Sequence, residues 1–256
     1  MLKFLGWSAS SAACALTLAS AACVTSSSSP SAAPSFDGGK FDGAFDGAFD
    51  ARVEPPPGDA QPDTSDASTT LTFVSGPDWP SFDGDLSGSD GGTSGPAKTV
   101  CVAPGVPASC PAGAVVYRAT GAGWTGVVSV PGALWIWRGD VAVGNQADLQ
   151  FAVFEKTFTL GANPSGVIQI LADDYVEVRV NGTTAGSNGS VTVNADAFQA
   201  QSVPKTVDLT PYLHAGQNTL TVVGQNGPQS FGSCAAPCTF AENTAGVLFG
   251  GALTSH

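Results

Sequence analysis

The sequence predicts an all-β protein, a β-sandwich that follows a disordered N-terminal segment. Three observations predict this fold class. The chain has 256 residues, with 32 Gly, 18 Pro and only 12% charged residues, which suits strands joined by long loops rather than helices. Short apolar segments alternate with a period of two residues. Turn-forming dipeptides such as Asn181-Gly182 separate these segments, and the length allows one or two domains.

The first 22 residues are typical of an export signal. Lys3 supplies a positive charge, and an apolar stretch of small residues follows that is too short to remain in a membrane as a spanning helix. The stretch ends at Cys23, before the Ser-rich sequence VTSSSSPSAAPS. This junction resembles the signal of bacterial lipoproteins, although Ser20 stands where that family usually has Leu. The resemblance implies that Cys23 carries a lipid anchor in the bacterial cell envelope; the alternative is ordinary secretion after cleavage near residue 21 or 22.

Residues 23–69 are predicted to form a disordered tether. The sequence FDGGKFDGAFDGAFDA is an imperfect repeat in which lone Phe residues are separated by Gly and Asp, and a Pro- and Asp-rich stretch continues it. Such a composition cannot bury enough apolar surface to fold. The tether also carries much of the acidity, because residues 24–99 hold 12 acidic and 3 basic side chains. Neither half of the chain has a basic patch, which argues against a nucleic-acid partner.

Residues 70–256 are predicted to form one β-sandwich domain. The predicted strands lie within residues 70–74, 113–124, 127–137, 148–160, 166–182, 190–198, 205–227 and 244–255, and a predicted turn at residues 215–218 divides the stretch 205–227. A change of phase within 148–160 predicts a bulge or a corner. Residues 166–182 give the longest strand pattern, in which Val176, Val178 and Val180 share one face and Tyr175, Glu177 and Arg179 share the other.

Four cysteines follow the signal segment: Cys101, Cys110, Cys234 and Cys238. In an exported chain four cysteines indicate two disulfides, and three pairings are possible. The local pairs Cys101–Cys110 and Cys234–Cys238 are favoured, because each spans a short loop-like sequence. A zinc site is the competing interpretation, but paired Cys-x-x-Cys spacing and a nearby His are missing from the sequence.

Three phrases in succession resemble the galactose-binding-domain-like jelly roll, the sandwich appended to many bacterial glycoside hydrolases. They are ADDYVEVRVNG, VDLTPYLHAGQNTLTVVGQN and NTAGVLFGGAL. Their order and spacing match that family over residues 70–255. The resemblance implies a carbohydrate-binding module rather than an enzyme.

Asp173 and Asp174 are the only adjacent acids in the domain. In a continuous strand their side chains would point to opposite faces, so they could not flank one scissile bond as a glycosidase pair does. The resemblance implies that acids near strand ends can hold a structural calcium ion, for which oxygen ligands are suited. The other interpretation is that both are polar end-caps that accept hydrogen bonds from loop amides. No cofactor other than this possible calcium is predicted.

Other catalytic constellations are missing from the sequence. A Ser-His-Asp triad would have to use His214, and no Gly-x-Ser-x-Gly motif is present. The chain is therefore predicted not to be an enzyme.

The predicted ligand site rests on aromatic and polar side chains. Flat aromatic faces bind the apolar faces of sugars, and amide or charged groups fix the hydroxyls. Trp124, in a Gly-rich loop, is the first candidate for such a platform. Trp135 and Trp137 share a strand face that is more typical of a core, yet Trp137 stays a candidate together with Arg138, Gln225 and Asn226.

Together these observations predict an exported, lipid-anchored, non-catalytic protein that binds carbohydrate. The first alternative is a structural envelope protein that docks another envelope or extracellular protein. The second is an accessory domain of a glycoside-degrading system.

Overall fold

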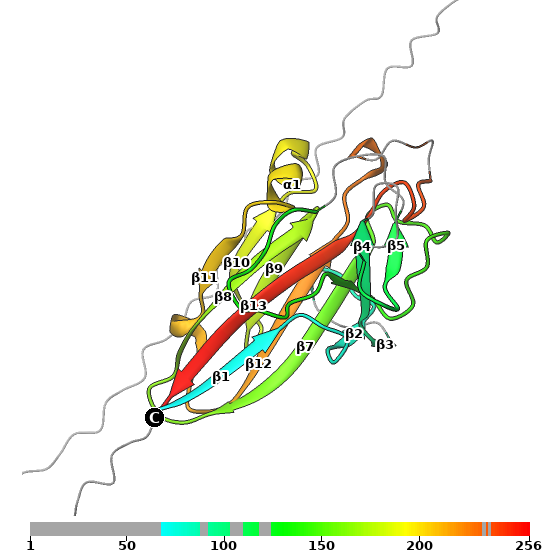
Figure 1. Ribbon diagram of the computed structural model, residues 1–256. Coiled ribbons are helices and arrows are strands. Elements are labelled where there is room, and N and C mark those ends of the chain that lie inside the picture. Colours follow the sequence, from blue (N-terminus) through cyan, green and yellow to red (C-terminus); the bar gives the residue numbers. More distant parts are fainter. Residues whose placement is uncertain (1–67, 88–91, 103–109, 118–123, 232–233, 235–236) are drawn as a thin grey trace, which may run out of the picture. The chain divides into compact units, whose positions relative to one another are not determined.

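Two β-sheets stacked in layers form the fold (Figure 1). The computed structural model describes residues 68–87, 92–102, 110–117, 124–231, 234 and 237–256. The predicted export signal, Cys23 and residues 23–67 of the predicted tether lie outside these ranges. Among the described residues, no helix is long and apolar enough to cross a membrane.

The first sheet has the strand order β11-β8-β13-β6-β4-β5, and β1 also pairs with β13. Its strands are β1 (Thr69–Val74), β4 (Lys98–Val102), β5 (Val115–Tyr117), β6 (Ile136–Trp137), β8 (Ser165–Asp173), β11 (Lys205–Asp208) and β13 (Gly246–Ser255).

The second sheet has the order β10-β9-β12-β7-β2-β3. Its strands are β2 (Pro80–Phe82), β3 (Thr93–Pro96), β7 (Phe151–Leu160), β9 (Tyr175–Val180), β10 (Thr183–Gly189) and β12 (Gly216–Gln225). The described helical segments are α1 (Asn194–Ala200) and the short 3-10 turns η2 (Thr210–Tyr212) and η3 (Gln229–Phe231). The predicted all-β sandwich is thus confirmed.

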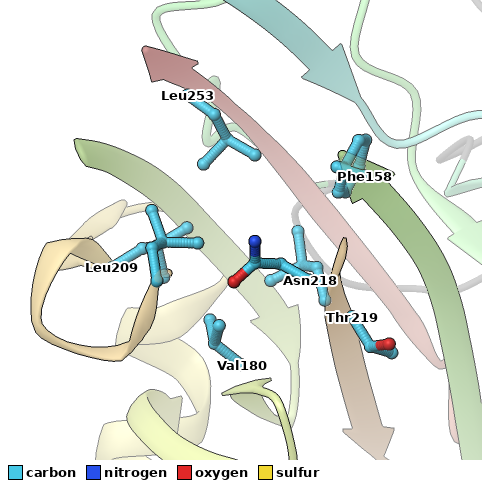
Figure 2. A pocket seen from close by; sticks show the side chains of 8 residues that line it. Phe158, Val180, Leu209, Asn218, Thr219 and Leu253 are labelled. Atoms are coloured by element: carbon cyan, nitrogen blue, oxygen red, sulfur yellow. The ribbon is translucent and has the colours of Figure 1, made fainter. Parts of the chain in front are cut away.

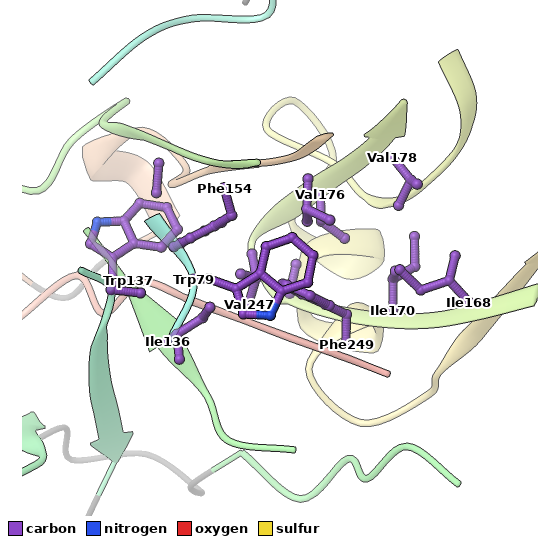
Figure 3. Packing of buried hydrophobic residues seen from close by; sticks show 14 of the residues in the cluster. Trp79, Ile136, Trp137, Phe154, Ile168, Ile170, Val176, Val178, Val247 and Phe249 are labelled. Carbon is purple, nitrogen blue, oxygen red and sulfur yellow. The ribbon is translucent and has the colours of Figure 1, made fainter. Parts of the chain in front are cut away.

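The core lies between the two sheets and is built from alternate residues of the long strands (Figure 3). Val176, Val178 and Val180 of β9 are buried in it, as the alternation predicts. Trp79 packs edge-on against Phe249 of β13, with ring centroids 4.9 Å apart. Both tryptophan and phenylalanine are fully buried, so these rings fill the centre of the sandwich.

The stretch predicted as one long strand over residues 166–182 is two strands in different sheets. β8 ends at Asp173 in the first sheet, and β9 begins at Tyr175 in the second. Asp174 lies between them and follows a cis peptide bond. The sequence pattern missed this corner because apolar alternation continues on both sides of it, since both strands face the same core.

The change of phase within residues 148–160 does not mark a bulge or a corner. β7 is continuous and pairs with β12 along its whole length, from Phe151–Gln225 to Leu160–Gly216. Both faces are covered near its start, where Val153 on the outer face and Phe154 on the core face are fully buried. Because adjacent residues on both faces of β7 are apolar there, the alternation of apolar and polar residues in the sequence shifts its phase without any break in the strand.

Residues 127–135 were predicted to continue a strand, but they form an irregular segment with bends and a turn at 131–132 and without ladder pairing. The segment lies along the outer side of the first sheet, where Gly126 donates its N–H to the carbonyl of Gln201 over 3.1 Å. Ser129 N donates to Oε1 of Gln169 over 2.6 Å. Side-chain hydrogen bonds and apolar contacts therefore replace a backbone ladder here.

Residues 190–198 were also predicted as a strand and are a bend followed by α1. Ser190 Oγ accepts hydrogen bonds from the N–H groups of Thr192 and Val193, at 3.1 and 3.0 Å. This local bonding turns the chain, and the Ala-rich sequence that follows favours a helix.

The hairpin between β9 and β10 forms at Asn181-Gly182, as predicted. Asn181 has φ 52° and Gly182 has φ 79°, which is the positive-φ pair that the Asn-Gly signal indicates. Asn181 also reaches the neighbouring β12: its Oδ1 accepts from Thr219 N over 2.9 Å, and its Nδ2 donates to Asn218 Oδ1 over 3.0 Å. The hairpin is thereby fixed to the turn that precedes β12.

Asn218 holds this end of the sandwich together. It is 2% exposed, accepts from His214 N over 3.0 Å and donates to the carbonyls of His214 and Gly216. Its amide lies among Phe158, Leu209 and Leu253 in Figure 2, beside an apolar cavity of about 10 Å³. A cavity this small is at the lower limit for one water molecule, so it belongs to the packing and offers no ligand site.

Both disulfides join the local pairs. Cys101 and Cys110 are bonded with Cα atoms 5.8 Å apart, and Cys234 is bonded to Cys238 with Cα atoms 5.6 Å apart. The first bond links Cys101 in β4 to Cys110, and Cys238 of the second bond is fully buried.

We expect Asn218→Ala to lower the free energy of unfolding by roughly 2–4 kcal/mol, because the buried partners of the amide lose their hydrogen bonds. Urea denaturation followed by tryptophan fluorescence measures the change. Asn194→Ala is the matched control, because Asn194 is exposed and its side chain does not cap α1. Equal stabilities of the two variants would contradict this role of Asn218.

Candidate functional site

Aromatic side chains gather where β8 ends and β13 begins. Trp124 stacks on Trp135 with ring centroids 4.3 Å apart and an interplanar angle of 27°. Tyr117 packs edge-on against Trp124 at 6.0 Å and lies nearly parallel to Phe240 at 6.1 Å. Both tryptophans are partly exposed, whereas Tyr117 is buried. The cluster therefore runs from the core to the surface.

The two tryptophans line a surface pocket of about 190 Å³. The other lining residues come from β4, from the residue after Cys110 and from the segment before β6; they are Val100, Cys101, Val102, Pro111, Ala133 and Leu134. The pocket walls are thus aromatic and aliphatic, with the disulfide at one side.

The carboxylate of Asp173 fixes the orientation of Trp124. Trp124 Nε1 donates to Asp173 Oδ2 over 3.0 Å. Gln201 Nε2 donates to Oδ1 over 2.6 Å, and Thr244 Oγ1 donates to Oδ2 over 2.5 Å. One carboxylate therefore connects the end of β8 with the Trp124 loop, the end of α1 and the segment before β13.

Asp174 extends this network to the segment after β12. Its Oδ2 accepts from Gly227 N over 2.7 Å, and its backbone carbonyl accepts from Ser190 N over 3.2 Å. Gly227 is required at this close approach, because a Cβ there would lie 2.4 Å from Oδ2. As the sequence predicted for end-caps, Asp174 accepts a hydrogen bond from a loop amide.

The two carboxyl groups lie together, which differs from the prediction that they point to opposite faces. Their side chains hydrogen-bond to each other. Strand alternation does not apply here, because Asp174 is in the corner between β8 and β9 rather than inside a strand. Both residues are only 4% exposed, so the pair is a buried one.

Burial sets the ionisation of this pair. Burial, and then the charge of Asp173, raise the pKa of Asp174 from 3.8 to about 9. Burial also raises the pKa of Asp173, but hydrogen bonds from Thr244, Trp124 and Gln201 oppose that effect. At neutral pH Asp174 therefore keeps its proton, which it can donate to Asp173.

The surroundings of the pair bear on the predicted structural calcium ion. Calcium takes six to eight oxygen ligands. Here the carboxylate oxygens face N–H and O–H donors from Trp124, Gln201, Thr244 and Gly227. Among the described ranges, no group of three or more His, Cys, Asp or Glu side chains could hold a metal ion. Calcium binding at this pair stays a prediction.

Two of the predicted ligand-binding residues are in the interior and bind other parts of the chain. Trp137 is fully buried, 6.5 Å from Phe240 between ring centroids, so it cannot form a platform. Arg138 is 9% exposed and pairs with Asp83 at 2.5 Å and Asp140 at 3.0 Å. Its guanidinium fixes two loops.

The two predicted amides are buried as well. Asn226 is fully buried and donates to the carbonyls of Ala147 and Asn243, over 2.8 and 3.2 Å. Gln225 is 8% exposed at the end of β12. Of the predicted ligand-binding set, only Trp124 reaches a surface pocket. Sequence reasoning treated Trp135 as a core residue, although it lies beside Trp124 in that pocket.

A second recess is polar and lies over the second sheet, with a volume of about 370 Å³. It is lined by Ser87, Glu155, Arg179, Asn181, Gly182, Thr219 and Thr221. Sequence reasoning placed Arg179 on the face opposite the core valines but assigned it no role. The signal that could have found this recess is the row of polar residues at alternate positions in β9 and β12.

The described residues hold no hydrolytic triad. The ring of His214 is exposed, and its Nδ1 lies 2.9 Å from the carbonyl oxygen of Ala215, so it has a backbone partner and no acid partner.

The search for related proteins gives no family model that matches and no curated relative. Solved structures with partial similarity include an α-L-rhamnosidase of Streptomyces avermitilis, 24% identical over 49% of this chain and 11% of that one, with a TM-score of 0.36. An FMN-binding β-glucuronidase of Facaelibacterium prausnitzii is 17% identical over 73% and 22% of the two chains, with a TM-score of 0.34. A putative β-galactosidase of Bacteroides fragilis is 14% identical over 72% and 23%, with a TM-score of 0.33.

The chain spans between 11% and 31% of the length of the solved structures it matches. TM-scores of this size carry no conclusion about function, and the sandwich is established by the strand topology itself.

We expect Asp174→Asn to remove most of the pH dependence of stability between pH 5 and 8.5. The pKa of Asp174 is raised on folding, so its stabilisation is complete below pH 4 and is lost as the pH rises towards 9, by up to about 1.4 kcal/mol per pH unit. Asn keeps a donor towards Asp173 and an acceptor for Gly227 at every pH. The variant should therefore be more stable than the wild type at pH 8.

Urea denaturation at several pH values tests this. Asp196→Asn, an exposed acid on α1, is the control and should keep the slope of the wild type. If Asp174→Asn also keeps that slope, Asp174 does not keep its proton at neutral pH.

Proposed function

We propose that this chain is a non-catalytic carbohydrate-binding module of the galactose-binding-domain-like type. The observation that carries the proposal is the stacked Trp124–Trp135 pair at the wall of a surface pocket. Partly exposed indole rings that line a pocket offer flat apolar surface on which the C–H face of a sugar ring packs. Asp173 holds Trp124 in place before any ligand arrives, which lowers the entropy cost of binding.

The described acids support binding rather than hydrolysis. A glycosidase needs two carboxyl groups about 5–10 Å apart, with the substrate between them. Asp173 and Asp174 are hydrogen-bonded to each other in the interior, and no substrate fits between them.

A docking role for another protein is the second candidate, and one specific observation favours it. Exposed apolar side chains surround α1: Phe198 is 65% exposed, Val203 50% and Val193 48%. Val127, 74% exposed, belongs to the same region, because its neighbour Gly126 bonds to the end of α1. Isolated apolar residues are common at surfaces, but a contiguous group is typical of a protein contact.

Export and lipid anchoring belong to the proposal as well. Two disulfides are typical of oxidising compartments such as the bacterial periplasm or cell surface. The lipoprotein-like junction at Cys23 would attach the chain to the envelope, and residues 23–69 would act as the spacer to the sandwich.

Binding to soluble polysaccharides by native affinity electrophoresis tests the tryptophan pocket. We expect Trp135→Leu to weaken binding at least tenfold, because it removes an aromatic face while it keeps an apolar side chain against the core. Phe198→Ala is the control, since it removes an exposed aromatic ring on α1 and should leave glycan binding unchanged.

Thermal unfolding of each variant separates lost binding from lost folding. If a polysaccharide retards the Trp135→Leu variant as strongly as the wild type, the ligand binds outside the tryptophan pocket. Absence of retardation by every polysaccharide, with Phe198→Ala reducing capture of an envelope protein, would favour the docking role.

Lipidation is tested by expressing the full sequence in a bacterial host with labelled palmitate. We expect label on the wild type and on Cys14→Ser, whose altered cysteine lies within the signal, and none on Cys23→Ser. An unlabelled wild-type protein that begins at residue 22 or 23 would show ordinary secretion.

A further inference from the structure

A row of polar side chains crosses the outer face of the second sheet. The register places Thr221 of β12 opposite Glu155 of β7 on one side and opposite Arg179 of β9 on the other. Thr184 of β10 continues the row beside Arg179. Residues directly opposite each other in an antiparallel ladder point to the same face, so these four side chains form one strip across four strands.

The side chains of this strip are held in place by one another. Arg179 Nε donates to Glu177 Oε1 over 2.6 Å, and both side chains are close to nine-tenths buried. Thr184 Oγ1 donates to the same oxygen of Glu177 over 3.0 Å, and Nη2 of Arg179 donates to the carbonyl of Leu86. Arg179 is therefore fixed and its charge is balanced by Glu177.

Glu155 is the acid of the strip without a basic partner. Thr221 Oγ1 donates to Glu155 Oε2 over 3.1 Å. Among the described residues, no hydrogen bond or ion pair uses Oε1 of Glu155. Thr221 is 7% exposed and lines the same recess, so it orients the carboxylate from below.

The recess over this strip has a volume of about 370 Å³, and each of its lining side chains is polar. Its free chemistry consists of one open carboxylate, one neutralised guanidinium and three hydroxyl groups, because the N–H groups of the Asn181 amide already donate to Tyr212 and Asn218. A carboxylate accepts hydrogen bonds from two neighbouring hydroxyls, and serine and threonine hydroxyls serve as donors or acceptors. This set matches a ligand with many hydroxyl groups.

We propose that this recess is a second ligand site, which binds an uncharged, hydroxyl-rich glycan chain through Glu155, Arg179 and Thr221. An acidic glycan is excluded because Glu155 is unneutralised and the chain has a net charge of −12. The inference rests on the proposed function only for the class of ligand, since the residues involved are different.

The two sites lie on different parts of the sandwich. The tryptophan pocket is built from β4 and the segment before β6, in the first sheet. The recess is built from β7, β9 and β12, in the second sheet, and the two share no lining residue. One molecule could therefore hold two glycan chains at once and cross-link them, which raises the avidity for a polymer.

The test uses the purified chain with three neutral polysaccharides, namely galactomannan, xyloglucan and mixed-linkage β-glucan, and with polygalacturonate as the acidic probe. Affinity electrophoresis gives binding, and light scattering of the mixtures gives cross-linking. The variants are Glu155→Gln for the recess and Trp135→Leu for the tryptophan pocket. Glu242→Gln is the matched control, because Glu242 is an exposed acid that also accepts from a threonine hydroxyl, Thr239.

We expect the wild type and the Glu242→Gln variant to bind a neutral polysaccharide and to raise its light scattering. Neither protein should bind polygalacturonate. Each single-site variant should keep weaker binding, reduced at least tenfold in avidity, and lose the scattering. If the Glu155→Gln variant binds the polysaccharide and raises its light scattering as much as the Glu242→Gln variant does, the second site is overturned.

The remaining outcomes separate the two proposals. Loss of all binding in Trp135→Leu overturns the second site but supports the tryptophan pocket. Loss of all binding in Glu155→Gln, with Trp135→Leu unaffected, supports the recess and overturns the pocket. A wild type that binds none of the neutral probes overturns both.

Discussion

The passage of the chain from one sheet to the other at Asp173 and Asp174 is the constraint on which the rest of this structure depends. β8 and β9 contribute core residues to opposite layers, so the corner between them must lie in the interior. A buried corner exposes backbone and side-chain polar groups to a medium without water, and each of them needs a partner. Here the proton of Asp174 and donors from four other segments supply these partners.

Much of the architecture could be predicted from the sequence, because it depends on local patterns. The Asn181-Gly182 turn and the alternation of valines in β9 define the hairpin and its core face without reference to the rest of the chain. The corner at Asp174 could not be predicted in this way, since apolar alternation is the same on either side of a change of sheet. Local patterns also misled around Val193: its β-branched neighbours suggest a strand, but Ser190 Oγ accepts hydrogen bonds from the N–H groups of Thr192 and Val193 and turns the chain into α1.

The candidate site was harder to predict, because burial depends on long-range packing. Trp135 and Trp137 are two residues apart, yet one is at the surface and the other in the core. Asn226 lies in a polar stretch typical of a sugar-binding loop, but its amide is in the interior and donates to the carbonyls of Ala147 and Asn243 in two other segments. For Arg179 the position could be predicted but the role could not. Alternation places it on the outer face, whereas its role depends on neighbours in β7 and β12 that no local pattern connects to it.

The two proposed ligand sites differ in the interactions that they offer to a ligand. The side chains of the tryptophan pocket are aromatic and aliphatic, so their contribution would come from removing water from ring faces. The recess over the second sheet offers fixed hydrogen-bonding groups, so its contribution would be selectivity among hydroxyl patterns more than affinity. Neither surface requires the chain to change shape, because Trp124 and Arg179 are already held by partners.

The pairing of β1 with β13 has a mechanical consequence. Thr69, where the described sandwich begins, pairs with Ser255, whereas the tryptophan pocket and Asp173 lie near Gly246 at the other end of β13, roughly 30 Å away for a ten-residue strand. If a bound polymer is pulled while the chain is held from its N-terminal side, the force runs along β1. All six residue pairs of that ladder then bear the load together instead of opening one after another, so the first described strand of the sandwich is loaded in shear.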